Sequence, residues 1–224
     1  MTPELREQVP VIQEVLAAMD IEIVTKEGYE ADDILGTLGR KCEAEGMEVT
    51  IVSGDRDLLQ LATDHILIRI PKTVKRVTTI ENYHTAEVLE KYSLLPKQII
   101  DLKALMGDTA DNIPGLPGVG EKTATKILLQ YGTLENAHAH FEEIKPNKAK
   151  EAMRDHYDLA ELSKNLATID TDAPVELDRE KAALSNFYTP KAYEMFKRLE
   201  FKNLLGRFEE TNAEPEDAVF LRTV

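Results

Sequence analysis

Hydrophobic and polar positions in the first part of the chain alternate between helical and extended patterns. Helical spacing predicts a helix over residues 10–19 and another that ends near Gly46, with apolar positions at Ile34, Leu35, Leu38 and Cys42. Extended patterns predict strands at 21–25, 47–53 and 65–70, and residues 72–80 are expected to form a hairpin with the third of these. A short helix is expected at 58–62. This order predicts an α/β fold with a mostly parallel sheet and ligand sites beyond the carboxyl ends of its strands.

From residue 85 onward the pattern is helical almost throughout. Residues 149–169 and 190–208 each predict one long helix, and 209–218 are acidic, polar and weakly patterned, as in a linker or tail. We therefore expect an α/β unit at 1–93, a helical unit at 94–208 and a tail at 209–224.

The stretch LMGDTADNIPGLPGVGEKTATKILLQYG, residues 105–132, predicts a helix, a glycine hairpin and a second helix. An apolar stripe of Ile99, Leu102 and Met106 precedes it, and Ala124, Ile127, Leu128 and Tyr131 share one face of the helix that follows. Gly132 stands where a left-handed C-terminal cap is expected.

Three glycines of the hairpin, Gly115, Gly118 and Gly120, allow positive φ or a close backbone approach. Free N–H groups at such a hairpin and helix start favour an anion, and phosphate is the natural ligand. An ordinary helix–helix corner would also use Gly, Pro, Asp and Asn. That alternative leaves the two preceding aspartates unexplained.

Seven acidic residues form three compact clusters. They are Glu30, Asp32 and Asp33 at the start of a helix, Asp55 and Asp57 after a strand, and Asp108 and Asp111 ahead of the glycine hairpin. Acids in a first helical turn also complement the helix dipole, and Gly-Asp is a common turn, so each cluster has a simpler explanation in isolation.

Two of the clusters follow predicted parallel strands, where carboxylates would converge and repel one another unless cations bind. Ligation by oxygen alone suits Mg²⁺ or Mn²⁺. The five histidines and one cysteine lack zinc spacing, and DTADNIPG lacks the calcium-loop pattern. A carboxylate-rich centre that holds two metal ions beside a phosphate-binding hairpin indicates phosphodiester hydrolysis.

The composition of the chain is that of a soluble globular protein, with 42% hydrophobic and 30% charged residues. A net charge of −14 argues against a large basic nucleic-acid surface, although lysines balance the acids over residues 94–150. The start, MTPELREQVP, lacks the pattern of a signal peptide, and one cysteine excludes an internal disulfide.

The motifs GYEADD, SGDRDLLQL and LMGDTADNIPGLPGVGEKTA occur in this order and resemble the 5′-nuclease domains of bacterial DNA polymerases I, relatives of the flap endonucleases. The resemblance runs from about residue 2 to 208. It implies a PIN-like α/β core followed by a helical domain with a helix–three-turn–helix, or helix-hairpin-helix, motif. It also implies removal of 5′ flaps and RNA primers from DNA in replication and repair, in the bacterial cytoplasm near the nucleoid, usually by a chain fused to polymerase domains.

The resemblance also assigns roles to residues. The seven acids named above would bind two Mg²⁺ or Mn²⁺ ions, with Asp32, Asp55, Asp57 and Asp108 central to catalysis. DNA contacts would come from the hairpin and the start of its second helix, at Gly115, Gly118, Val119, Gly120, Lys122, Thr123 and Lys126. A K⁺ ion often sits in this hairpin in the family.

One departure from the family pattern stands out. The family begins with a strand ending in Asp-Gly-Asn, a second strand ending in Phe-Asp and a basic helical arch, whereas this sequence opens at TPELREQ, where the family resumes after the arch. We therefore expect an incomplete core and weak or absent cleavage by this chain alone.

Two alternatives to a nuclease remain open. A non-catalytic DNA-binding module would keep the hairpin and lose the chemistry. A small-molecule phosphohydrolase would use the acids but would leave the hairpin and the helical unit without a role.

Overall fold

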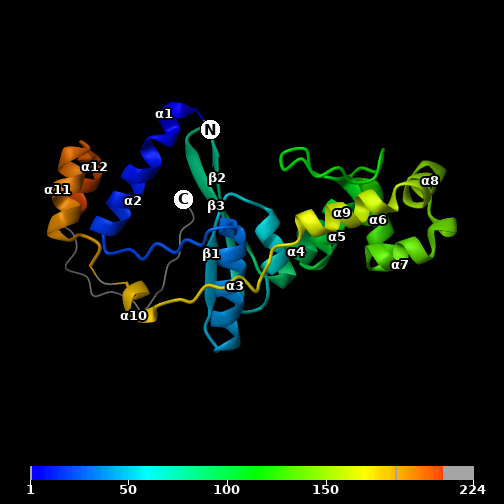
Figure 1. Ribbon diagram of the computed structural model, residues 1–224, viewed down its shortest axis with the longest axis horizontal. Helices are drawn as coiled ribbons and strands as arrows, with labels where there is room; N and C mark the ends of the chain where they lie inside the picture. Colours follow the sequence, from blue (N-terminus) through cyan, green and yellow to red (C-terminus); the bar gives the residue numbers. More distant parts are fainter. Residues whose placement is uncertain (1, 185, 209–224) are drawn as a thin grey trace.

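The computed structural model describes residues 2–184 and 186–208, and the predicted acidic tail lies outside them. A three-stranded sheet lies at the centre of an elongated molecule, with a bundle of helices at one end and a pair of packed helical segments at the other (Figure 1). The elements of the α/β part are α1 (Pro3–Arg6), α2 (Gln8–Ala18), α3 (Ala31–Ala44), β1 (Val49–Val52), η1 (Asp57–Leu61), β2 (Ile66–Val74), β3 (Val77–Tyr83) and α4 (Thr85–Tyr92).

The rest of the described chain is helical, as the sequence predicts. Its elements are α5 (Gln98–Met106), α6 (Glu121–Tyr131), α7 (Leu134–Ala139), η2 (Phe141–Glu143), α8 (Asn147–Asp155), α9 (Tyr157–Ala167), α10 (Arg179–Ala182), α11 (Pro190–Arg198), α12 (Lys202–Leu205) and η3 (Gly206–Phe208).

The sheet has the order β1-β2-β3 and is mixed. β1 pairs parallel with β2, and β2 pairs antiparallel with β3. The predicted hairpin is present, with Lys75 and Arg76 at its tip at φ 49° and 68°. Both tip residues have positive φ, as a two-residue hairpin turn requires. The sheet is therefore less parallel than the pattern predicts.

The prediction of a strand at residues 21–25 is wrong. Residues 21–24 are half-buried and residue 25 is exposed, but the segment makes no strand pairing in the described chain. A strand needs a neighbour to receive its backbone hydrogen bonds. The alternation of apolar and polar residues reflects partial burial of the segment and carries no information on whether a neighbouring strand pairs with it.

A continuous core joins the sheet to the helical bundle. The first five residues of β2 alternate in burial, so that Ile66, Ile68 and Ile70 belong to one buried cluster with residues of η1 and α3. The same buried cluster continues through α5, α6, α8 and α9. Because α5 packs on η1 as well as on α6 and α9, it places the loop that follows it beside the turn that follows β1.

The two long predicted helices are interrupted. His156, at φ −135° and ψ 28°, separates α8 from α9, and Glu200, at φ 56°, ends α11. The Phe201 N–H then donates to the Phe196 carbonyl over 2.9 Å, which closes the helix end. The 3.6-residue apolar period continues across His156, so the pattern could not reveal the break. Gly132 ends α6 with a positive φ of 83°, as predicted, but its ψ of −49° lies outside the left-handed helical region, so the cap is not the left-handed one that the sequence predicts.

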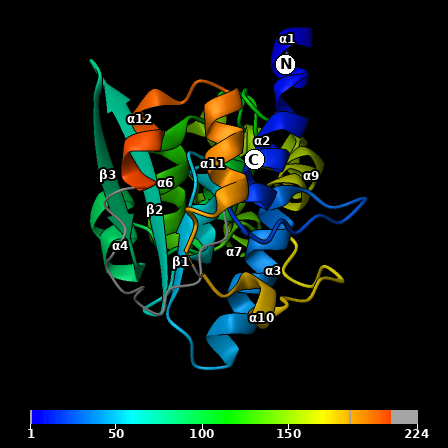
Figure 2. The same cartoon turned by 90° about the vertical axis from the view of Figure 1, so that its left-hand side faces the viewer.

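The ends of the described chain lie side by side. α2 and α11 pack together at the end of the molecule opposite the helical bundle (Figures 1 and 2). The Thr189 hydroxyl donates to the Ala18 carbonyl over 2.6 Å, and Arg198 pairs with Glu14 over 2.9 Å. Between α9 and α10 the chain runs along α3, where the Thr37 hydroxyl accepts from the Ala173 N–H over 3.0 Å.

Candidate metal centre

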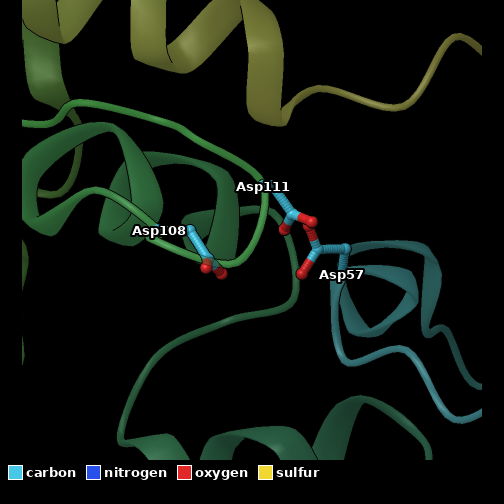
Figure 3. A group of neighbouring side chains, drawn as sticks. All are labelled: Asp57, Asp108 and Asp111. Carbon is cyan, nitrogen blue, oxygen red and sulfur yellow. The ribbon is translucent and has the colours of Figure 1, made fainter. Parts of the chain in front are cut away.

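Three predicted acidic residues meet at the junction of the sheet and the helical bundle. Asp57 begins η1 just beyond the carboxyl end of β1, and Asp108 and Asp111 lie in the loop after α5. Each offers a carboxylate oxygen, and these oxygens all lie within 4.8 Å of one another. Figure 3 shows the three carboxylates converging from the two elements. Carboxylate oxygens at this spacing fit a hard divalent cation such as Mg²⁺ or Mn²⁺.

The loop that carries Asp108 and Asp111 is tightly closed. Asp108 and Ile113 exchange backbone hydrogen bonds of 2.9 and 2.8 Å, and the Asp108 carboxylate accepts from the Ala110 N–H over 2.8 Å. Gly107 and Gly115, both at positive φ, cross at the base of the loop. The backbone thus fixes the position of Asp108 without help from a ligand.

Lys103 of α5 is the nearest cation to this cluster. The residue as a whole is 8% exposed, and its ammonium forms ion pairs with Asp57, with Asp108 over 2.7 Å and with Asp111 over 3.3 Å. In the sequence, Lys103 is one of the lysines that balance the acids of residues 94–150, and no motif singles it out. Its position four residues after Ile99, on the face that α5 buries, was the available signal, because an unpaired lysine is rarely buried.

The pKa values in the cluster follow from this arrangement. Burial raises the pKa of Asp57 even though Lys103 opposes the shift, and hydrogen bonding from Lys103 lowers the pKa of Asp108. The pKa of Lys103 is raised, because its carboxylate partners outweigh the cost of burying an ammonium. We therefore expect Lys103 and Asp108 to be charged at neutral pH.

Asp32, in the first turn of α3, is a further acidic residue whose pKa is shifted. Burial raises its pKa to about 6, and the charges of Asp55 and Asp57 add to the shift. Asp55 itself accepts from the Asp57 N–H over 2.9 Å, which fixes the turn after β1. Asp32 and Asp55 therefore interact electrostatically with Asp57, and their part in metal binding remains a prediction.

Asp32→Asn is expected to stabilise the metal-free protein at neutral pH. A carboxyl with a pKa of about 6 when folded and about 4 when unfolded binds more protons in the folded state between these values, so stability falls as pH rises through that window. Allowing for the half-exposure of Asp32, the gain is about 1 kcal/mol at pH 7.5 and smaller at pH 5. Urea unfolding in EDTA measures it, with Asp64→Asn as control. A gain of equal size at both pH values would contradict the shift.

Glu30 and Asp33 serve the start of α3. They form a capping box, and the Asp33 carboxylate accepts both from the Glu30 N–H over 3.0 Å and from the Asp170 N–H over 2.9 Å. The structure brings neither residue into the group of three. Their part in metal binding remains a prediction.

The glycine hairpin lies between α5 and α6. Val119 is 4% exposed and anchors it, and Gly120 caps α6 with its carbonyl accepting from the Thr123 N–H over 2.9 Å. Gly115 is buried and donates its N–H to Ser163 over 2.9 Å, so it closes the loop and is not free to meet a ligand. Gly118 and Gly120 are exposed, with Gly118 at φ 75°.

The lysines around the hairpin come from two helices. Lys122 and Lys126 are exposed on α6, near half-buried Thr123. Lys148 of α8, which the sequence analysis did not select, lies over Gly118, where a β-carbon would come within 2.4 Å of its Cε and 2.7 Å of its Nζ. Thirty positions separate these two residues in the sequence, so periodicity could not pair them.

A cavity of about 420 Å³ lies beside the carboxylates. Its lining includes Asp55, Asp57, Lys103, Asp108 and Asp111, together with Glu121 from the start of α6. The cavity therefore extends from the acidic cluster towards the helix that carries the glycine hairpin.

An α/β unit with carboxylates beyond a strand, followed by helices that carry a glycine hairpin, defines a PIN-like core with a helix-hairpin-helix domain. Residues 1–93 match the model of the 5′-3′ exonuclease N-terminal resolvase-like domain, and residues 94–189 match that of the 5′-3′ exonuclease C-terminal SAM fold. The chain belongs to the 5′-3′ exonuclease family.

Its relatives include much longer proteins. The chain is 50% identical over 214 residues to DNA polymerase I of Bacillus caldotenax and 48% identical over 214 residues to that of Bacillus subtilis (strain 168). Each match covers 96% of this chain and 24% of the relative. The chain thus spans about a quarter of the length of these relatives.

Solved structures share the fold. T5 5′-exonuclease with bound divalent metal ions (zinc) matches with a TM-score of 0.63 and 20% identity, covering 94% of this chain and 70% of that one. The catalytic core of Rad2 in complex with DNA substrate matches with a TM-score of 0.62 and 16% identity, covering 96% and 72%. Within residues 2–184 and 186–208, no helix is long and apolar enough to cross a membrane.

Proposed function

We propose that this chain is a divalent-metal-dependent 5′-nuclease that acts on DNA with a 5′ flap or nick. The observation that carries the proposal is the convergence of Asp57, Asp108 and Asp111 next to a cavity that is also lined by Asp55 and by Glu121, the first residue of α6. Membership of the 5′-3′ exonuclease family supports the same chemistry.

Different residues of the chain would bind the metal ions and the DNA. Asp57, Asp108 and Asp111 would hold one Mg²⁺ or Mn²⁺, and Asp32 and Asp55 would help to hold a second. When bound, such ions lower the pKa of a water molecule and stabilise the attacking and leaving oxygens. Gly118, Gly120, Lys122, Thr123, Lys126 and Lys148 would bind phosphates of the duplex, so that the structure of the DNA and not its base sequence decides where it is cut.

Further parts of the proposal follow from the family. The α/β core comprises residues 1–93, and the helical DNA-binding unit, which also contributes Asp108 and Asp111 to the metal centre, comprises residues 94–208. K⁺ would bind at the hairpin, an RNA primer–DNA hybrid would be a second substrate, and the protein would work near the nucleoid in the bacterial cytoplasm. Fusion to polymerase domains, as in the polymerases I that it resembles, would place this activity beside DNA synthesis.

Cleavage of a labelled 5′-flap duplex tests the proposed function. We expect slow cutting in Mg²⁺ that Asp108→Ala/Asp111→Ala abolishes, because both carboxylates belong to the cluster. The alternative is a DNA-binding module without catalysis, favoured by the position of the Lys103 ammonium among the same carboxylates. Flap binding that persists in EDTA, without cutting in Mg²⁺, would support that alternative.

Lys122→Ala/Lys148→Ala is expected to weaken flap binding and to make it less sensitive to salt. Lys148 stands in the first turn of α8, where a cation opposes the helix dipole, so helix stability does not account for its presence. Each lost phosphate contact should reduce the slope of log affinity against log salt by about 1. Fluorescence anisotropy in EDTA measures this slope.

Lys181→Ala provides the control for that experiment, because Lys181 lies on α10, away from the hairpin, and pairs with Asp178 over 3.2 Å (Figure 1). A double variant that binds with the wild-type salt slope would show that these lysines do not contact phosphate.

A further inference from the structure

Lys103 shares its three carboxylate partners with the proposed metal ion. Its ammonium contacts Asp57, Asp108 and Asp111, and the carboxylate oxygens of these residues lie within 4.8 Å of one another. The lysine side chain is 10% exposed, so its charge depends on these partners and not on water.

An ammonium and a divalent ion cannot share this position. A Mg²⁺ ion approaches its oxygen ligands to about 2.1 Å, and an ammonium needs about 2.8 Å to each acceptor. Three carboxylates this close together leave room for only one such cation between them. A metal ion that binds all three must therefore displace the Lys103 ammonium.

We propose that Lys103 is a tethered cation that competes with the divalent ion for Asp57, Asp108 and Asp111. This inference rests on the proposed metal centre and adds a residue that sets how tightly the centre binds metal. Lys103 links the turn after β1 to the loop after α5, so it keeps the carboxylates together and also lowers their affinity for metal.

The cavity gives the displaced side chain a destination. Lys103 lines it together with Asp55 and Glu121, and a lysine has four rotatable side-chain bonds. Released from the three aspartates, the ammonium can move into this space and stay near Asp55. Metal binding is therefore expected to increase the chemical accessibility of Lys103.

Lys103→Met tests the competition directly, because methionine keeps much of the side-chain volume and removes the charge. Titration with Mn²⁺, followed by the electron paramagnetic resonance of the free ion, should show binding about tenfold tighter than wild type or better. Lys191→Met, exposed on α11, should bind Mn²⁺ as wild type does. Lys103→Arg keeps the charge and should show no such gain.

A second measurement uses the unaltered protein and does not depend on the folding of a variant. Reductive methylation followed by mass spectrometry should label Lys103 faster when Mg²⁺ is added, with the exposed Lys191 as the internal reference. Equal Mn²⁺ affinity of wild type and Lys103→Met, or labelling of Lys103 that Mg²⁺ does not change, would overturn the inference alone. Absence of Mn²⁺ binding from both proteins would overturn the metal centre as well.

Discussion

Asp57→Asn/Asp108→Asn is expected to lose Mn²⁺ binding by a factor of about a hundred or more. The two carboxylates come from different elements, and Asp108 is fixed by its closed loop, so Asp111 alone cannot replace them. Mutation of residues that only support metal ligands already lowers metal affinity about 10–100-fold, and loss of two ligands should lower it further. Isothermal titration with Mn²⁺ measures the loss.

The control for this variant removes the same charge elsewhere. Asp64→Asn/Asp158→Asn changes two exposed aspartates outside the cluster and should leave Mn²⁺ binding unchanged. The Asp57→Asn/Asp108→Asn variant leaves Lys103 with Asp111 as its remaining partner among the three, and a buried lysine with fewer ion pairs destabilises the fold. Circular dichroism therefore verifies that the variant is folded. If the Asp57→Asn/Asp108→Asn variant bound Mn²⁺ with the same affinity as the wild type, the ion would bind at a site other than this cluster.

Gly115→Ala is expected to destabilise the fold by at least about 4 kcal/mol, which only severe steric conflict or a comparable defect produces. A β-carbon at Gly115 would lie 2.2 Å from the Gly107 nitrogen and 2.6 Å from its Cα. These neighbours are backbone atoms, so they cannot move aside as a flexible side chain can. Gly115 also adopts φ 62°, which adds strain for any residue with a β-carbon.

Gly46→Ala separates the two causes. Gly46 has φ 81°, but a β-carbon there would meet nothing within 4 Å. Backbone strain alone should cost about 1–2 kcal/mol at this position. Denaturant unfolding in EDTA compares the two variants, and equal losses would show that the crossing of Gly107 and Gly115 does not determine the stability of the loop.

The sequence predicts much of the site because its acids follow strand and helix ends. Asp57, Asp108 and Asp111 meet as the order of elements implies, and the glycines at 115 and 118 have positive φ. Lys103 and Lys148 were missed, because each acts on residues of another element. Lys103 meets Asp57 only through the packing of α5 on η1, and Lys148 meets Gly118 only because α8 folds back onto the hairpin.

The errors in the fold have a similar origin. Periodicity reports which side of a segment is buried, so it could distinguish neither the unpaired segment 21–25 from a strand nor two helices from one across His156. A strand pairing and a change in helix direction are both decided by contacts with distant residues. Local pattern carries no information about those contacts.

Anomalous X-ray scattering from a crystal soaked in MnCl₂ tests most directly whether this acidic cluster is a metal centre. We predict one peak within about 2.2 Å of oxygens from Asp57, Asp108 and Asp111, with the Lys103 side chain moved into the cavity. A second peak is expected towards Asp32 and Asp55. Saturating Mn²⁺ with no peak at these carboxylates, and with Lys103 still bound to all three aspartates, would contradict the account.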